Sequence, residues 1–183
     1  LMPIPEAEVR LMIADAKERD YAVVVCGREE IGVYNHSMIY EDVFVKGLKV
    51  TNIDVHKSIE PMLDKPVLQL TPFFSTEDEE LIMPAMKHCI SARWHPLFTD
   101  ITLQGADKGS GLLKMAAYIG IEPSECIAFG DGGNDMSILR AAGIGVAMGN
   151  ANEDVQAVAD YVTTSVDEDG IRNAFIHFNI IEE

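Results

Sequence analysis

The chain has 183 residues, enough for one ordinary domain or two small ones, and its 48% hydrophobic and 24% charged residues are typical of a folded globular protein. Thirty acidic against fourteen basic side chains leave a formal net charge of −16. Because nucleic acids and anionic membranes are bound through Lys and Arg, this charge argues against both as partners. The cysteines are odd in number and far apart, which predicts reduced thiols in a cytoplasmic protein rather than disulfides or a zinc site.

The first half of the chain predicts an α+β module with a sheet and two or three helices. Residues 6–19 carry apolar residues at helical spacing. Asp54 is expected to cap a short helix that Pro61 helps to end. An acidic helix start at 75–80 precedes Pro84, which predicts a late start or a kink. The strands that we expect in this half are 21–25, 31–34, 67–70, 89–94 and 98–103.

After about residue 97, helices alternate with short apolar strands. The expected helices are 109–119, 134–142, 152–159 and one from about 170; the expected strands are 126–129, 145–148 and 161–164. This alternation predicts a parallel sheet that is covered on both faces. Ligands of such sheets bind beyond the carboxyl ends of the strands. Asp131 and Asn150 follow two of these ends.

The run from Ala128 to Asp135 places two carboxylates around a glycine turn directly after a strand. The strand end fixes Asp131, and the glycines let the backbone approach a ligand closely. Asn134 then opens a helix whose free N–H groups and dipole favour a phosphate. Oxygen ligands beside a phosphate suit Mg²⁺. The alternative is a plain strand-to-helix turn in which the Asp and Asn residues only cap a helix.

Lys108 stands at the start of the expected helix 109–119, where its positive charge opposes the helix dipole. An anionic cluster of Asp131, Asp135 and a phosphate accounts for a lysine at this place. The alternative is an ordinary solvated lysine on the surface.

Three segments together, 105–109, 129–136 and 143–151, resemble the haloacid dehalogenase (HAD) superfamily. More closely they resemble the Cof-type sugar-phosphate phosphatases with the α/β cap known as type IIB, and the resemblance covers nearly the whole chain. It implies an α/β fold with part of a Rossmannoid parallel sheet, the C-terminal half of the core, and an α+β cap. We expect the cap at 1–96 and the core half at 97–183.

By that resemblance, Lys108 steadies the phosphate and a covalent aspartyl-phosphate, and Asn134 helps to place the phosphate. Asp131 and Asp135 are then the acidic residues of a Mg²⁺ site. Phosphoryl transfer needs positioning and charge neutralisation above all, which agrees with these roles. The implied substrate is a small phosphorylated metabolite such as a sugar phosphate. A calcium loop is excluded because Ala142, twelfth from Asp131, offers no carboxylate.

Weaker candidates for contacts between the cap and a substrate are Arg28, Arg93 and His95, since phosphorylated sugars need cationic and hydrogen-bonding partners. Ordinary surface or core roles are the alternative for each of them, as they are for Trp94.

The chain departs from the family in one respect. The resemblance implies a nucleophilic aspartate in an Asp-x-Asp motif followed by Gly-Thr, and no such motif stands upstream of Lys108. Asp167-Glu168-Asp169 has the bare spacing but follows the wrong strand. The sequence therefore predicts a fragment that is inactive alone, or else a non-catalytic module that binds phosphate or metal. The edge beside 126–129 would be open, which invites self-association or a partner.

Overall fold

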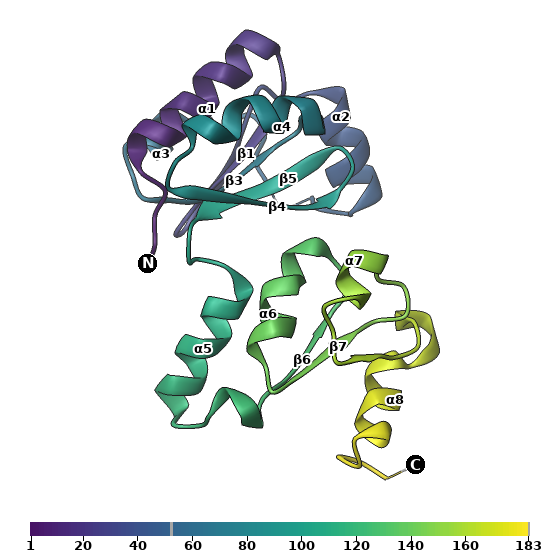
Figure 1. Cartoon of the computed structure of the whole chain (residues 1–183). Helices are drawn as coiled ribbons and strands as arrows, with labels where there is room; N and C mark the ends of the chain where they lie inside the picture. Colours follow the sequence, from purple (N-terminus) through teal and green to yellow (C-terminus); the bar gives the residue numbers. More distant parts are fainter. Residues whose placement is uncertain (52, 183) are drawn as a thin grey trace. The chain divides into compact units, whose positions relative to one another are not determined.

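The computed structural model describes residues 1–51 and 53–182 and divides into two compact units, Leu1–Gln104 and Gly105–Glu183 (Figure 1). The sequence places the boundary between residues 96 and 97. The division falls later because the strand Phe98–Leu103 pairs with two strands of the first unit.

The first unit is built on one antiparallel sheet with the strand order β2-β1-β3-β5-β4. The strands are β1 (Val23–Gly27), β2 (Ile31–Tyr34), β3 (Val67–Pro72), β4 (Cys89–His95) and β5 (Phe98–Leu103). All five overlap the strands expected from the sequence. Strands β1 and β3 are far apart in the sequence, and their pairing joins β1 and β2 to the rest of the sheet.

Alternate residues of this sheet enter two separate hydrophobic clusters, as the two-residue period of a strand requires. On one face, Leu70 and Ile101 pack with helices α1 (Glu6–Arg19), α3 (Glu60–Leu63) and α4 (Thr76–Ile82). On the other face, Phe73 and Phe98 pack with α2 (Met38–Tyr40) and the π-helix that follows it, Glu41–Gly47.

Two local expectations change in the structure. The helix predicted after Asp54 is wrong, because a turn occupies this place and α3 starts only at Glu60. Pro61 lies in the first turn of α3, where its missing N–H costs no hydrogen bond, so it opens a helix instead of ending one. The late start expected because of Pro84 is wrong, since α4 begins at Thr76; Pro84 lies instead in a 3₁₀ turn at Met83–Ala85 that follows the end of α4 at Ile82.

The second unit contains a parallel sheet with the order β6-β7-β8, as the alternating pattern predicts. Its strands are β6 (Ile127–Gly130), β7 (Ile144–Ala147) and β8 (Tyr161–Val162), and its helices are α5 (Lys108–Ile119), α6 (Met136–Ala141), α7 (Glu153–Gln156) and α8 (Gly170–His177). Helix α7 and strand β8 are shorter than expected. Strand β6 is an end strand of this sheet.

Within the described residues, no helix is both long and apolar enough to cross a bilayer.

Candidate active site

The turn after β6 is held together by a close approach between Gly130 and Asp135. A Cβ atom on Gly130 would lie 2.4 Å from the Asp135 Cβ, nearer than two carbon atoms can pack. After Gly132 a single 3₁₀ turn, Gly133–Asp135, leads directly into α6. The turn therefore brings the Asp135 side chain back under the strand end.

Asp135 is buried, with 8% of its surface exposed, and its carboxylate is bound on both oxygens. Oδ2 accepts the backbone N–H groups of Asp131 at 3.0 Å and Gly132 at 3.1 Å. Oδ1 accepts a hydrogen bond from Lys108, which also forms an ion pair with it. Burial acts to raise the pKa of Asp135, but the hydrogen bonds from Lys108 and from the two N–H groups outweigh it and leave the pKa lowered. Asp135 is thus held as an anion.

Lys108 is the first residue of α5, and two contacts fix this helix start. The Asp107 carboxylate caps it by accepting the Ser110 N–H at 2.9 Å. The Gly109 N–H donates to the Ser137 hydroxyl at 3.1 Å, which joins the starts of α5 and α6. The Lys108 side chain is half exposed and paired with Asp135. Its unfavourable place at a helix start is therefore compensated by a buried anion.

Asp131 is exposed at the carboxyl end of β6, and its orientation depends on Asn150, which follows β7. The Asn150 side-chain N–H donates to Asp131 Oδ2 at 3.0 Å, while Asn150 Oδ1 accepts the Val166 N–H at 3.1 Å. The sequence places Asn150 at a strand end but gives it no role. Parallel neighbouring strands bring the two ends together, which a residue pattern alone does not reveal.

Asn134 lies half-buried in the 3₁₀ turn between the two carboxylates. The structure thus brings Lys108, Asp131 and Asp135 to one edge of the second unit, with Asn134 inside the same turn.

Comparison with known proteins decides the family. Residues 2–175 match the family model of the haloacid dehalogenase-like hydrolases. The chain is 31% identical over 183 residues to the putative phosphatase YkrA of Bacillus subtilis, covering 98% of this chain and 69% of YkrA. The chain belongs to the haloacid dehalogenase-like hydrolases.

Solved structures agree with this assignment. The HAD subclass IIB sugar phosphatase BT4131 superposes with a TM-score of 0.93 and 40% identity, over 98% of this chain and 69% of that one. The phosphatase BT1666 from Bacteroides thetaiotaomicron gives a TM-score of 0.85 and 40% identity, over 98% and 67%. The chain thus spans about two thirds of these relatives. By family it is a phosphatase with the fold of the capped IIB subclass.

Phosphatases of this superfamily are generally metal-dependent, and the donors of this hydrolase suit a hard cation in part. Asp131 Oδ1 accepts no hydrogen bond from a described residue, so this oxygen is available to a cation. The Asp135 oxygens already accept three hydrogen bonds. In the described part of the chain, no group of three or more His, Cys, Asp or Glu could hold a metal. Asp131 is therefore the residue that could ligate a metal cation, and Asp135 adds a second negative charge nearby.

Of the three predicted substrate contacts of the hydrolase's first unit, the structure joins only Arg93 and His95, since Arg93 donates to the His95 carbonyl at 3.4 Å. Arg28 is an exposed residue of the β1–β2 turn that reaches Glu29 at 3.9 Å. Arg93 pairs with Glu79 at 2.6 Å and donates to several backbone carbonyls. These contacts give it a structural role. His95 stacks on Phe98, and burial together with Arg93 lowers the pKa of its imidazole.

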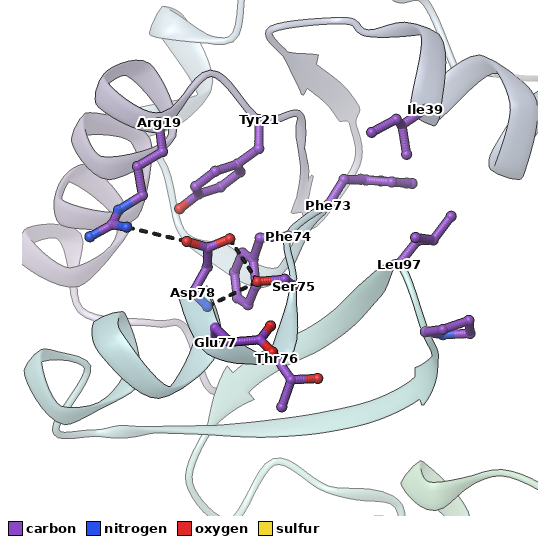
Figure 2. Close-up of a pocket in the computed structure, with 11 residues that line it drawn as sticks. Arg19, Tyr21, Ile39, Phe73, Phe74, Ser75, Thr76, Glu77, Asp78 and Leu97 are labelled. Carbon is purple, nitrogen blue, oxygen red and sulfur yellow. Dashed lines mark hydrogen bonds and ion pairs between the residues drawn. The ribbon is translucent and has the colours of Figure 1, made fainter.

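The first unit of this hydrolase also has a hollow of about 410 Å³ beside α1 and the residues after β3. Figure 2 shows its rim, where Asp78 accepts from Arg19 at 3.2 Å and Ser75 binds the same carboxylate at 2.9 Å. Phe73 and Phe74 lie among its lining residues. Arg19 is paired with both Asp15 and Asp78, and Glu77 also lines the hollow, so its lining carries more negative than positive charge.

Proposed function

We propose that this chain carries the metal- and phosphate-binding half of a Mg²⁺-dependent phosphatase that hydrolyses small phosphorylated metabolites, with sugar phosphates as the preferred class. The observation that carries the proposal is the arrangement at the β6 end: Asp131 has an available oxygen, and the buried Asp135 carboxylate accepts both the Asp131 N–H and Lys108. A cation and a lysine at one point are what a phosphate dianion needs in a chain of net charge −16.

In this proposal the residues of the turn have separate tasks. Asp131 is a ligand of the Mg²⁺, which when bound neutralises charge on the phosphate. Asp135 is the second acid of the metal site and holds Lys108. Lys108 binds the phosphate oxygens through its exposed half, and Asn134 donates a hydrogen bond to the phosphate.

The proposed reaction passes through an aspartyl-phosphate, as the family resemblance implies. The sequence has no Asp-x-Asp followed by Gly-Thr before Lys108. We therefore propose that the 183-residue chain is part of a longer catalytic unit and has little or no turnover alone. The second candidate, a non-catalytic module for phosphate or metal, rests on the same missing motif.

Metal binding is the direct test. Titration calorimetry of the chain with Mg²⁺ is expected to show binding that Asp131→Asn abolishes, whereas Asp154→Asn in the exposed first turn of α7 leaves it intact. Equal binding by both variants contradicts the proposed ligand. Phosphate release from a panel of sugar phosphates should stay at background. Robust Mg²⁺-dependent turnover that Asp131→Ala removes contradicts the claim of inactivity.

The enzyme and the module differ in what the gene encodes. An apolar strand that ends in Asp-x-Asp-Gly-Thr, encoded upstream of Leu1, supports the enzyme. A reading frame that lacks this motif supports the non-catalytic module. The three cysteines are free thiols, which supports a reducing, cytoplasmic location for either.

We also propose that the chain self-associates through the second unit. Strand β6 ends the described sheet, and an unpaired strand edge attracts another strand. Helix α5 exposes Met115, Tyr118 and Ile119 on neighbouring turns, with 59%, 87% and 58% of their surface accessible. Sedimentation velocity over a range of concentrations should show dimers or larger species. A monomer at all concentrations contradicts this proposal.

A further inference from the structure

The sheet of the first unit has a polar patch on the face that does not carry α1 and α4. Asp100 is on the same face as Phe98, because residues of a strand alternate and Phe98 belongs to the cluster opposite α1. In β5, Thr99 and Ile101, the two neighbours of Asp100 on the helix-covered face, are fully buried, whereas Leu103 at the strand end is half-buried. Asp100 and Thr102 remain half-buried. The sheet is thus less covered at Asp100 than directly behind it.

Three neutral donors orient the Asp100 carboxylate. Oδ1 accepts the Thr71 hydroxyl at 2.8 Å and the Gln69 amide at 2.9 Å. Oδ2 accepts the indole N–H of Trp94 at 2.9 Å. A carboxylate offers about four acceptor positions, so three donors leave room for one more hydrogen bond. Asp100 is therefore a fixed anion with acceptor capacity left.

Trp94 gives this patch an aromatic surface. Its ring meets Phe98 edge to face with the centroids 4.7 Å apart, and 37% of its surface remains exposed. The bond to Asp100 and the contact with Phe98 hold the indole in one orientation. A rigid, partly exposed indole beside hydrogen-bonding groups offers apolar contact and polar contact together.

The remaining groups of the patch are neutral. Gln69 Oε1 accepts no hydrogen bond from any described residue, so it is a second available acceptor. Burial and the charge of Asp100 raise the pKa of the Cys26 thiol to about 11, so that this side chain is uncharged at neutral pH. A phosphate is repelled by such a patch, whereas hydroxyl groups can donate to both acceptors.

We propose that Asp100, Gln69 and Trp94 form a binding site for a neutral polyhydroxylated group such as a sugar ring, with hydroxyls donating to Asp100 and Gln69 and a C–H face of the ring lying on Trp94. The inference rests on the proposed function only for choosing sugars as the ligand class. It concerns the first unit alone, and its test requires no turnover.

Trp94 is the single tryptophan of the chain, so its fluorescence reports on this site directly. Titration of the whole chain with glucose, mannose, ribose and sorbitol should give a saturable change in emission with at least one of them. Asp100→Asn should weaken that binding about tenfold, the usual value of one charge-assisted hydrogen bond. Asp64→Asn, an exposed aspartate of the same unit, should leave it unchanged.

A second variant covers a failure of Asp100→Asn to fold. Gln69→Ala removes one acceptor and should weaken the same titration, while circular dichroism confirms the fold. The proposal is overturned if no sugar changes the emission of the folded chain, or if the Asp100 and Asp64 variants bind equally. It is also overturned if tetramethylammonium or inorganic phosphate gives an equal response, since these probes report a cation site or an anion site.

The variant Asp131→Asn distinguishes a failure of the sugar-site proposal from a failure of the phosphatase proposal. If the polyol site exists, this variant keeps the sugar-induced change in Trp94 emission and loses only Mg²⁺ binding. Loss of Mg²⁺ binding therefore says nothing against the polyol site, and loss of the fluorescence response says nothing against the metal site.

Discussion

Lys108 and Asp135 form an ion pair across 27 positions of the sequence, joining the first residue of α5 to the turn before α6. The carboxylate also accepts two backbone N–H groups of that turn. Asp135 thus has a structural role that Asp131 does not share. Removing the Asp135 side chain is therefore expected to change the stability of the second unit more than removing the Asp131 side chain.

Replacing Asp135 should destabilise the second unit. Asp135→Ala leaves two backbone N–H groups and Lys108 without their partner, a loss of about 2–3 kcal/mol. Hydrogen exchange followed by mass spectrometry should then show faster exchange in peptides covering 127–136. Asp131→Ala is the control, because an exposed side chain changes stability by only about 0.5 kcal/mol. Equal protection in both variants would refute the structural role.

A methyl group on Gly130 should disrupt the same turn. Gly130→Ala forces the new Cβ to within 2.4 Å of Asp135, and overpacking of this kind costs about 1–3 kcal/mol. Gly111→Ala is the matched control in α5, since nothing lies within 4 Å of its Cβ position and helix propensity should raise stability by about 0.5–1 kcal/mol. Urea unfolding followed by circular dichroism should place the two variants on opposite sides of the wild type. If Gly130→Ala is as stable as the wild type, the close contact between Gly130 and Asp135 does not limit this position.

Asn150 should affect metal binding without contacting the metal. Asn150→Ala removes the donor that orients Asp131, and outer-shell changes of this kind weaken metal binding about tenfold. Calorimetric titration with Mg²⁺ measures the effect. Asn152→Ala is the control, since Asn152 precedes α7 and makes no side-chain capping bond. The same affinity in both variants would show that Asp131 needs no such support.

The first unit should lose stability in acid through Glu8. Burial acts to raise the pKa of Glu8, but hydrogen bonds from the His88 side chain, the Cys89 thiol and the His88 backbone lower it overall. A carboxyl whose pKa is lower in the folded state stabilises above its unfolded value of about 4.3, and this stabilisation is lost as the pH falls through the folded pKa.

The variant Glu8→Gln isolates this effect. It should be less stable than the wild type at neutral pH, and the gap should close as the pH falls below the folded pKa of Glu8. Unfolding followed by Trp94 fluorescence reports on this unit. Glu18→Gln on the exposed side of α1 should show no such gap. A gap that persists in strong acid would mean that packing, and not ionisation, is what the variant loses.

Local pattern was sufficient for most elements. Helix α1 follows from apolar spacing, and β6 and β7 from short apolar runs before glycine. The local pattern gave the wrong prediction at Pro61, because a proline can either end a helix or stand in its first turn. It also missed α2 and the π-helix at 41–47, whose Tyr40 and Phe44 are held by contacts with Phe73 and Phe98. Those aromatic partners are far away in the sequence.

The sequence by itself determined the family, the alternating second unit and the candidate residues Lys108, Asp131 and Asp135, because their motif is local and its spacing is specific. Only the tertiary structure decided how they divide their tasks. Lys108 meets Asp135 because the starts of helices α5 and α6 are joined, and Asn150 meets Asp131 because the parallel strands β6 and β7 bring their carboxyl ends to one edge. In the same way, antiparallel pairing of β3 and β5 places Gln69 and Asp100 together. Hydrogen bonds across such distances depend on which strands pair, and the apolar pattern within one strand does not identify its distant partner.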